Sequence, residues 1–312
     1  MKRILRDQLI YNFDAATPPV LTIDPGETVV VESHDTSTDR LNRAEDLKAF
    51  VAARNPLEVN PAGGPIFVNG AEPGDALAVT ILDIKLGSLG FVRTLNGAGA
   101  LQADIEPGSV MMVRTEGEDL VFAEKVRMPA RPMVGVLGTA PAEGRVYTAH
   151  PGAQGSNMDF NANTVGTTVY LPVHVPGALL GIGDLHATMG DGEVSGTGVE
   201  IRGETTARVD LIAGAAPKRP WMETESDWIA TGQGETLEIA VEEAVDNLTG
   251  ILQEKLDLTR TEAFLLVSAR GDVRFRLADA DPGAPTADQA RRRVVKLNSA
   301  SVASGPPISG AA

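Results

Sequence analysis

Short apolar runs, separated by turns rich in Gly and Pro, dominate the first two-thirds of the chain. The run at 27–32 is rich in β-branched residues, and the run at 76–84 alternates apolar and polar positions after a Glu-Pro-Gly-Asp turn. Both features are typical of strands. Further strands are expected at 110–114, 120–122, 167–175 and 207–212. This spacing predicts a mainly β fold with a β-sandwich or barrel-like body.

A helical pattern replaces the strand pattern toward the C-terminus. Residues 238–256 repeat apolar positions every three or four residues, and a second helix is expected at 259–269 with Thr261 as its N-cap. An earlier segment, 43–53, also fits a helix. The prediction is α+β overall, with a smaller α/β portion toward the C-terminus.

The organisation along the chain follows from this change of pattern. We expect one unit over 1–297, which is β-rich at 1–235 and mixed or helical at 236–297. Residues 298–312 are rich in Ser, Gly, Pro and Ala, and are expected to form a mobile tail.

Composition narrows the class of protein. The 312 residues include 42 acidic and 27 basic side chains, for a net charge of −15, and no basic block precedes Arg291-Arg292-Arg293, so a nucleic-acid partner is not expected. The absence of cysteine excludes thiolate metal sites and a cysteine nucleophile, and it fits a reducing compartment. Arg6 and Asp7 interrupt the first apolar run, so no apolar segment typical of a signal peptide is expected there. No window reaches the roughly 18 apolar residues of a membrane span. We therefore predict a cytoplasmic protein without a membrane partner.

Residues 181–200 concentrate the candidate chemistry. Asp184 and His186 are spaced i, i+2, which places both side chains on one face of a strand. Gly190-Asp191-Gly192 reads as a turn that folds Glu193 back toward them, with Asp191 serving the turn itself. Together they offer an oxygen, nitrogen and oxygen ligand set for one metal ion. The alternative is a polar hairpin around a histidine whose hydrogen bonds are satisfied.

Two other polar segments are candidates. His34 and Asp35 follow an apolar strand, where a strand-end loop exposes side chains to a pocket; the alternative is a surface turn. The glycine-rich stretch 150–159 holds Asn157 and Asp159 on one face if it is extended, and is otherwise an ordinary loop. No His-Glu-x-x-His, Gly-x-Ser-x-Gly or phosphate-binding motif is present in the sequence.

Several of these segments, in this order along the chain, resemble the acetamidase/formamidase family. The resemblance is carried by Asn157-Met158-Asp159, by residues 170–173 and 175–178, and above all by Gly183-Asp184 with His186-Ala187 and then 190–194. Residues 55–56, 63–75, 135–141 and 222–224 support it. It implies a mainly β fold, a homo-oligomer, and metal-dependent hydrolysis of short linear amides such as acetamide and formamide to a carboxylate and ammonia.

On this resemblance we assign roles as hypotheses. The metal would be zinc, with calcium or manganese as alternatives. Its expected ligands are His34, Asp35, Asp159, Asp184 and His186, although His34 and Asp35 both reach one ion only if the chain bends between them. Glu193 is the expected general base, or alternatively a metal ligand. Asn157 is the expected donor to the amide oxygen, with Glu143 as an alternative acid or base.

Two other functions stay open at this point. The chain could be a metal-dependent hydrolase of another C–N bond, in a lactam or a larger amide. It could also be a non-catalytic β protein that binds a metal or a small molecule.

Overall fold

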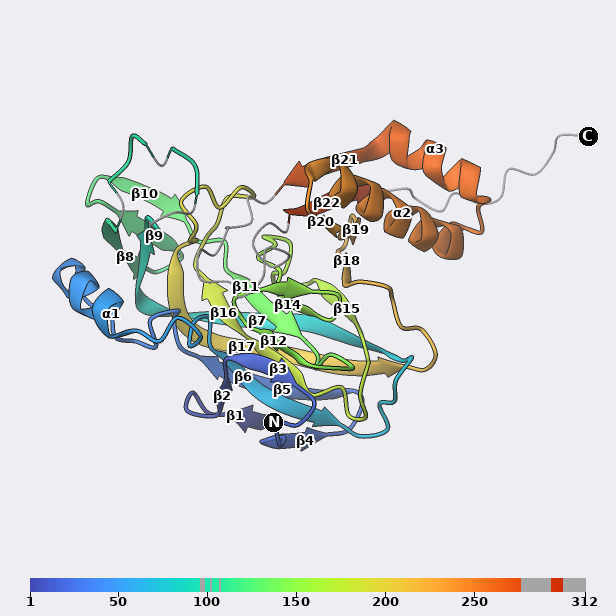
Figure 1. Cartoon of the computed structure of the whole chain (residues 1–312), viewed down its shortest axis with the longest axis horizontal. Helices are drawn as coiled ribbons and strands as arrows, with labels where there is room; N and C mark the ends of the chain where they lie inside the picture. The colour runs from blue at the N-terminus through green and yellow to red at the C-terminus, as the bar shows by residue number, and fades with distance from the viewer. Residues whose placement is uncertain (96–98, 102, 107, 276–292, 300–312) are drawn as a thin grey trace, which may run out of the picture.

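A computed structural model describes residues 1–95, 99–101, 103–106, 108–275 and 293–299. The fold is mainly β with few helices, as predicted (Figure 1). Within these described residues, twenty strands form one continuous folded sheet, and two more form a small ribbon of β3 (Asn12–Asp14) and β12 (Arg145–Tyr147). Almost all strand pairs are antiparallel, so one face of each strand can point to a shared core.

One half of the sheet is built around a long central strand, β17 (Glu200–Ile212). It pairs with β5 (Glu27–Ser33) on one side and with β7 (Ala76–Arg93) on the other. The strands beyond these two are β1 (Lys2–Ile4), β8 (Val110–Glu116), β9 (Asp119–Phe122), β10 (Val126–Pro129), β15 (Thr168–Pro172) and β18 (Trp221–Glu223).

The other half is built around β16 (Leu180–His186), which pairs with β6 (Ala62–Val68) and β11 (Met133–Gly138). Its remaining strands are β2 (Leu9–Ile10), β4 (Leu21–Ile23), β13 (Pro151–Gly152) and β14 (Gly155–Asn157). The two halves join where β16 leads into β17, through the residue pair His186 and Glu200.

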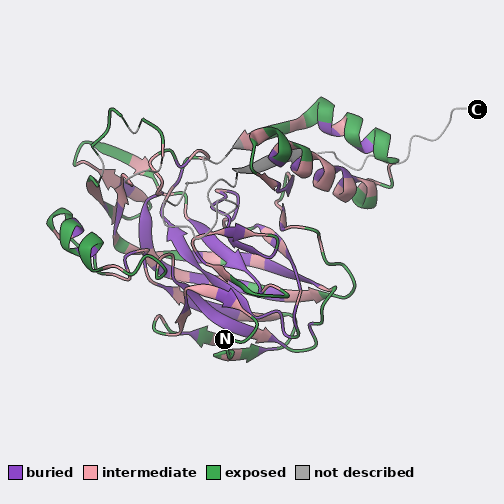
Figure 2. Cartoon of the chain, viewed as in Figure 1, coloured by how far each residue is buried: buried purple, intermediate pink, exposed green. Residues whose placement is uncertain are grey.

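The core lies between these halves, and Figure 2 shows the buried strands at the centre of the body. Val29 and Val31 of β5 are fully buried, and Gly63 of β6 lies directly against the Val31 side chain. Burying each such aliphatic side chain stabilises the fold by roughly 1.5–3 kcal/mol. Coverage on both faces explains why the three consecutive valines at 29–31 are all apolar, without the alternation of a half-exposed strand.

Two strand predictions were too short. β7 continues to Arg93 and β17 begins at Glu200, well outside the predicted 76–84 and 207–212. Gly87 and Gly90 interrupt the apolar pattern of β7, because a side chain at Gly90 would meet the backbone of Glu200. These glycines allow two strands to approach closely and do not end a strand.

The predicted strand at 167–175 ends earlier, at Pro172. Proline has no N–H to continue the ladder. The Val173 N–H instead donates to the backbone oxygen of Asp75. His174, which follows, is half-buried outside the strand.

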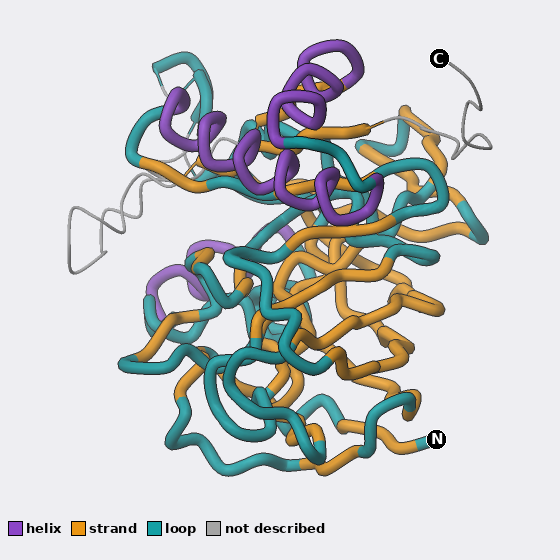
Figure 3. The backbone as a smooth tube through the Cα atoms, turned by 90° about the vertical axis from the view of Figure 1, so that its right-hand side faces the viewer, coloured by secondary structure: helices purple, strands orange, loops and turns teal. Residues whose placement is uncertain are grey.

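The helical portion packs on a small group of strands at one end of the body (Figures 1 and 3). Its helices are α2 (Leu237–Leu256) and α3 (Arg260–Arg270), and its strands are β19 (Trp228–Ala230), β20 (Gln233–Gly234), β21 (Gly271–Phe275) and β22 (Arg293–Ser299). Glu223 of β18 joins it to the body by accepting hydrogen bonds from Tyr170, Trp228 and Lys255.

The helix termini differ slightly from prediction. The N-cap of α3 is Thr259, which forms a capping box with Glu262, and Thr261 lies within the first turn. The early helix is α1 (Leu47–Ala53), preceded by the 3₁₀ turn η1 (Ala44–Asp46). Of the predicted tail, Asn298 and Ser299 belong to β22, and 300–312 lie outside the described residues. Among the described helices, none has the length and apolar character that a membrane crossing requires.

Candidate metal and catalytic site

Five acidic and histidine side chains meet where the two halves of the sheet join. They come from three parts of the chain and are all nearly inaccessible to solvent. They are Asp159, Asp184, His186, Glu193 and Glu200.

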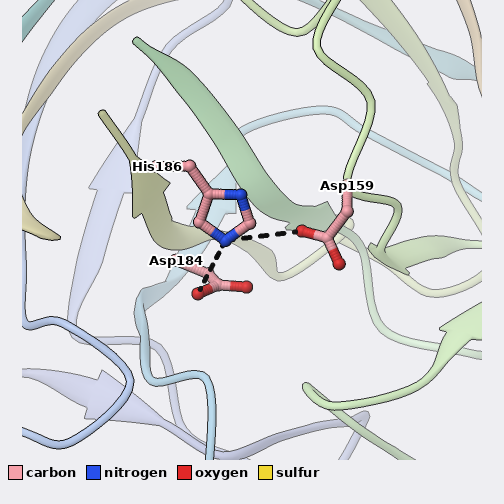
Figure 4. Close-up of side chains that lie close together, drawn as sticks. All are labelled: Asp159, Asp184 and His186. Atoms are coloured by element: carbon pink, nitrogen blue, oxygen red, sulfur yellow. Dashed lines mark ion pairs between the residues drawn. The ribbon is translucent and has the colours of Figure 1, made fainter. Parts of the chain in front are cut away.

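β16 supplies Asp184 and His186 near its C-terminal end. The Nε2 atom of His186 lies 3.7 Å from Asp184 Oδ1, so the i, i+2 spacing brings the two side chains together as expected (Figure 4). Asp184 has a positive φ of 56°, which marks an irregularity in the strand. An aspartate with this left-handed backbone conformation is uncommon outside turns, and such backbone strain is typical of functional sites.

The segment after β14 supplies Asp159. Its Oδ1 atom lies 3.9 Å from the same His186 nitrogen, and Figure 4 shows both carboxylates pointing at that edge of the ring. Asp159 also has a positive φ, of 42°, and its N–H donates to the backbone oxygen of Gly135. The tight approach of this segment to β11 therefore fixes the position of its carboxylate.

The loop between β16 and β17 brings two more carboxylates. Gly190 accepts a hydrogen bond from the Glu193 N–H, which closes the turn predicted at 190–192 and directs Glu193 inward. Glu200 pairs with His186 in the sheet register, and its Oε1 lies 3.2 Å from His186 Nε2.

Burial and mutual charge set the protonation of this group. Burial alone would lower the pKa of His186, but the carboxylates of Glu200 and Asp184 outweigh it and raise the pKa well above 6.5. Burial raises the pKa of Glu200 to about 7, although the His186 charge opposes this shift. Both shifts therefore favour the protonated forms of the pair.

The donor set fits a divalent cation. Two groups have ligand atoms within 4.8 Å of one another: Asp159, Asp184 and His186, and His186, Glu193 and Glu200. Within the described part of the chain, Asp184 Oδ1 and Glu200 Oε2 are enclosed yet take part in no hydrogen bond. Buried carboxylate oxygens normally have a partner, and a cation would provide one.

Two glycines leave room around this cluster. A side chain at Gly135 of β11 would overlap Asp159 Oδ1 and come within 2.9 Å of Asp184 Oδ2. A side chain at Gly198 would come within 2.7 Å of His186 Nδ1. The space that the carboxylates and the imidazole occupy therefore exists because these positions lack a Cβ.

Asn157 lies at the edge of the cluster with its amide engaged. Its Nδ2 donates to the backbone oxygen of Ala149, and its Oδ1 accepts from Asn60. Asn60 also donates to Asp184 Oδ2, over 3.1 Å. Asn157 as the donor to an amide oxygen stays a prediction, and Asn60 joins it as a residue that positions Asp184.

The structure places His34 and Asp35 in contacts of their own loop. His34 Nδ1 lies 2.9 Å from Asp39 Oδ2, and the buried Asp35 accepts hydrogen bonds from the Ser37 N–H, the Ser37 hydroxyl and the Asp39 N–H. Neither belongs to the two ligand groups. These contacts form a local turn, although Asp35 is buried and does not lie at the surface as the alternative interpretation had it.

The other candidates also lie apart from these groups. Glu143 is exposed in the loop between β11 and β12. Asp191 forms an ion pair with Arg274 of β21, at 3.3 Å, so it links the Glu193 loop to the helical portion.

Sequence reasoning gave no role to Glu200 or Asn60. Glu200 lies within 181–200, but its pairing with His186 depends on the register across a wide connection. Asn60 precedes Pro61 with a φ of 52°, and the Asn-Pro pair signals a turn without revealing what the side chain contacts.

The model of the acetamidase/formamidase family matches residues 6–148 and 142–280. A formamidase of Methylophilus methylotrophus is 29% identical, with 64% of this chain and 63% of the relative covered, and an acetamidase of Mycolicibacterium smegmatis is 28% identical, with 67% and 68% covered. The chain spans about three fifths of the length of the formamidases that it matches.

Solved structures match over nearly the full chain. The crystal structure of an acetamidase from Bacillus halodurans is 33% identical, with a TM-score of 0.84 and coverage of 95% of this chain and 97% of that one. A gamma lactamase from Delftia acidovorans, at 20% identity and a TM-score of 0.60 over 94% of this chain and 88% of its own, shares the fold.

Proposed function

The chain belongs to the acetamidase/formamidase family, and from this membership we propose that it hydrolyses short linear amides to a carboxylate and ammonia. The observation that carries the proposal is the buried convergence of Asp159, Asp184 and His186 with the two glutamates Glu193 and Glu200. A cluster that is only structural would leave no buried carboxylate oxygens without hydrogen bonds.

We propose Asp159, Asp184 and His186 as the residues that would hold a divalent metal ion. One imidazole with carboxylates suits zinc, while a set richer in oxygen would accept calcium or manganese. Bound there, the ion would supply a Lewis acid that polarises the amide carbonyl and lowers the pKa of water.

One of the two glutamates is proposed to carry out the proton transfers. An amide needs a proton removed from the attacking water and a proton delivered to the departing nitrogen, so that R–CO–NH₂ and water give R–COOH and NH₃. Glu193 is the proposed group for both transfers. The pKa of Glu200, raised to about 7 by burial, makes it the alternative, because a group that titrates near neutral pH exchanges protons most efficiently there.

Matched substitutions test these assignments. His186→Ala should lose bound metal by elemental analysis, whereas His34→Ala, which alters the one contact to Asp39, should retain it. Glu193→Gln should keep the metal and lose at least about a hundredfold in turnover. If Glu200→Gln shows that loss and Glu193→Gln does not, the roles of the two glutamates are reversed.

Ammonia release decides the substrate class. The metal-loaded protein is offered formamide, acetamide and propionamide, and in parallel a cyclic amide, because the lactam alternative shares this fold. Release from the linear amides supports the proposal. Ring opening of the lactam without release from linear amides would replace it, and metal binding without any turnover would favour a binding protein.

The oligomeric state and the cellular location of the protein are proposed on grounds other than the cluster. A homo-oligomer follows from the family resemblance, and light scattering after size-exclusion chromatography tests it. A cytoplasmic location rests on the composition, chiefly the absence of cysteine.

A further inference from the structure

A partly buried cation that forms no ion pair with the described residues lies next to the cluster. Arg93 is the last residue of β7, and its guanidinium forms no ion pair or hydrogen bond with the residues that the structure describes; its Nε is enclosed. A guanidinium with an enclosed Nε is normally paired, because leaving a charged donor without a partner away from water is costly. The chain has 42 acidic side chains against 27 basic ones, so a partner carboxylate would be easy to provide.

The surroundings of Arg93 add positive charge and an aromatic ring. Burial first, and then the charge of Arg54, lower the pKa of Arg93 to about 10, with Glu200 opposing the shift, so the group remains protonated at neutral pH. Its Cζ lies 5.7 Å from the centre of the Phe50 ring, which Arg40 also contacts at 5.2 Å. A cation–π contact offsets part of the desolvation but leaves the N–H donors without acceptors.

The position of Arg93 ties it to the cluster. The backbone N–H of Arg93 donates to the Thr197 hydroxyl oxygen at 3.0 Å, and that hydroxyl donates to the backbone carbonyl oxygen of Arg93 at 3.1 Å. The next residue, Gly198, packs against the His186 ring. Along β7, Phe91 lies opposite Glu200 in the sheet register. The cation is therefore on the strand that borders the cluster.

We infer that Arg93 is the anion-binding group of a carboxylate subsite beside the cluster, with Arg54 adding positive potential. A planar guanidinium matches a carboxylate in a bidentate pair, which satisfies two donors at once. The identity of the ligand rests on the proposed function, since amide hydrolysis forms a carboxylate at this place. The carboxylate has two sources: the acid formed by the reaction, or a second acidic group carried by the substrate.

Acetate is the probe for this subsite. Its affinity is measured by isothermal titration calorimetry at constant ionic strength, on the metal-loaded full chain and on Arg93→Met. Arg40→Met is the matched control, because it removes a cation from the same Phe50 ring. Acetate should bind the wild type and Arg40→Met alike, and at least tenfold more weakly to Arg93→Met. Equal affinity in all three proteins, or an equal loss in both variants, overturns the inference.

Arg93→Lys covers the case in which Arg93→Met does not fold. It keeps the charge and loses the bidentate fork, so acetate should bind it more weakly than the wild type while its melting transition stays intact. Unchanged acetate affinity in a folded Arg93→Lys would overturn the bidentate assignment.

Kinetics separate the two sources and separate this inference from the proposed function. If the carboxylate is the product, Arg93→Met weakens inhibition by acetate and leaves the KM for acetamide unchanged. If the substrate carries it, the variant raises the KM for the monoamide of a dicarboxylic acid selectively. Acetate binding that depends on Arg93 in a protein that cleaves no amide upholds the subsite and refutes the amidase. Amide turnover without acetate binding that depends on Arg93 upholds the amidase and refutes the subsite.

Discussion

Gly135→Ala is the change that most directly tests how the cluster is built. The backbone of Gly135 is ordinary for a strand, so alanine is conformationally acceptable there, and the effect of the substitution is steric. The new methyl group would overlap Asp159 Oδ1 and lie 2.8 Å from the backbone oxygen of Asp184 and 2.9 Å from its Oδ2. The backbone oxygen belongs to a paired strand and cannot move cheaply, so the two carboxylates have to separate.

The size of the effect follows from the cost of overpacking. One extra methyl group in a filled interior typically costs about 1–3 kcal/mol. If the arrangement that binds the ion carries this whole cost, metal affinity falls by roughly 5- to 150-fold. Turnover at limiting metal should fall in parallel.

The assay is competition for the metal with a chromophoric chelator, together with calorimetric melting. Gly190→Ala is the control, since it lies in the Glu193 loop, has no positive φ, and would place its methyl group in open space. Gly135→Ala should lose affinity and Gly190→Ala should not. Wild-type metal affinity in Gly135→Ala would show that Asp159 and Asp184 do not hold the ion together.

Three further predictions concern the helical portion and its contacts with the body. Gly250→Ala in α2 should stabilise the protein by about 1 kcal/mol, since the methyl group meets no atom within 4 Å; chemical denaturation measures this, and destabilisation would contradict it. Arg274→Met removes the ion pair to Asp191 and should lower kcat more than it raises KM, with recovery in Arg274→Lys; no recovery would assign Arg274 a packing role. Burial alone would raise the pKa of Glu223, but its hydrogen bonds lower that pKa below 4.5, so its contribution to stability is present above pH 4.5 and is lost as the pH falls through the lowered pKa. The melting temperature of Glu223→Gln should therefore fall less than that of the wild type as the pH is lowered. An unchanged dependence of melting temperature on pH would exclude this contribution.

The fold class and the pairing of Asp184 with His186 could be predicted because they depend on local pattern. Alternating runs gave the mainly β body, which the structural relatives confirm. Asp184 and His186 could be paired because the strand period is two residues. The prediction was wrong at the end of β7, because Gly87 and Gly90 look like breaks in a sequence and serve close strand packing in the fold.

The rest of the site depends on distances that a sequence does not contain. Glu200 reaches His186 through the register across the loop from 187 to 199, and that loop has no length rule that fixes register. His34 and Asp35 have suitable chemistry, but a local turn engages them in its own hydrogen bonds. The lack of an ion-pair partner for Arg93 among the described residues is a property of its surroundings, and the residue types in the sequence do not reveal it.

The junction of the two sheet halves at His186 and Glu200 has a mechanical consequence. An ion held by Asp159, Asp184 and His186 would fasten the β14 segment to β16 across β11, at the point where the sheet folds over. In a chain without cysteine, such an ion would cross-link distant segments as a disulfide does in a secreted protein, but this cross-link would be removable. Its loss would loosen the attachment of the β14 segment to β16 beside this junction, so heat tolerance of this protein would depend on how much free metal its surroundings supply.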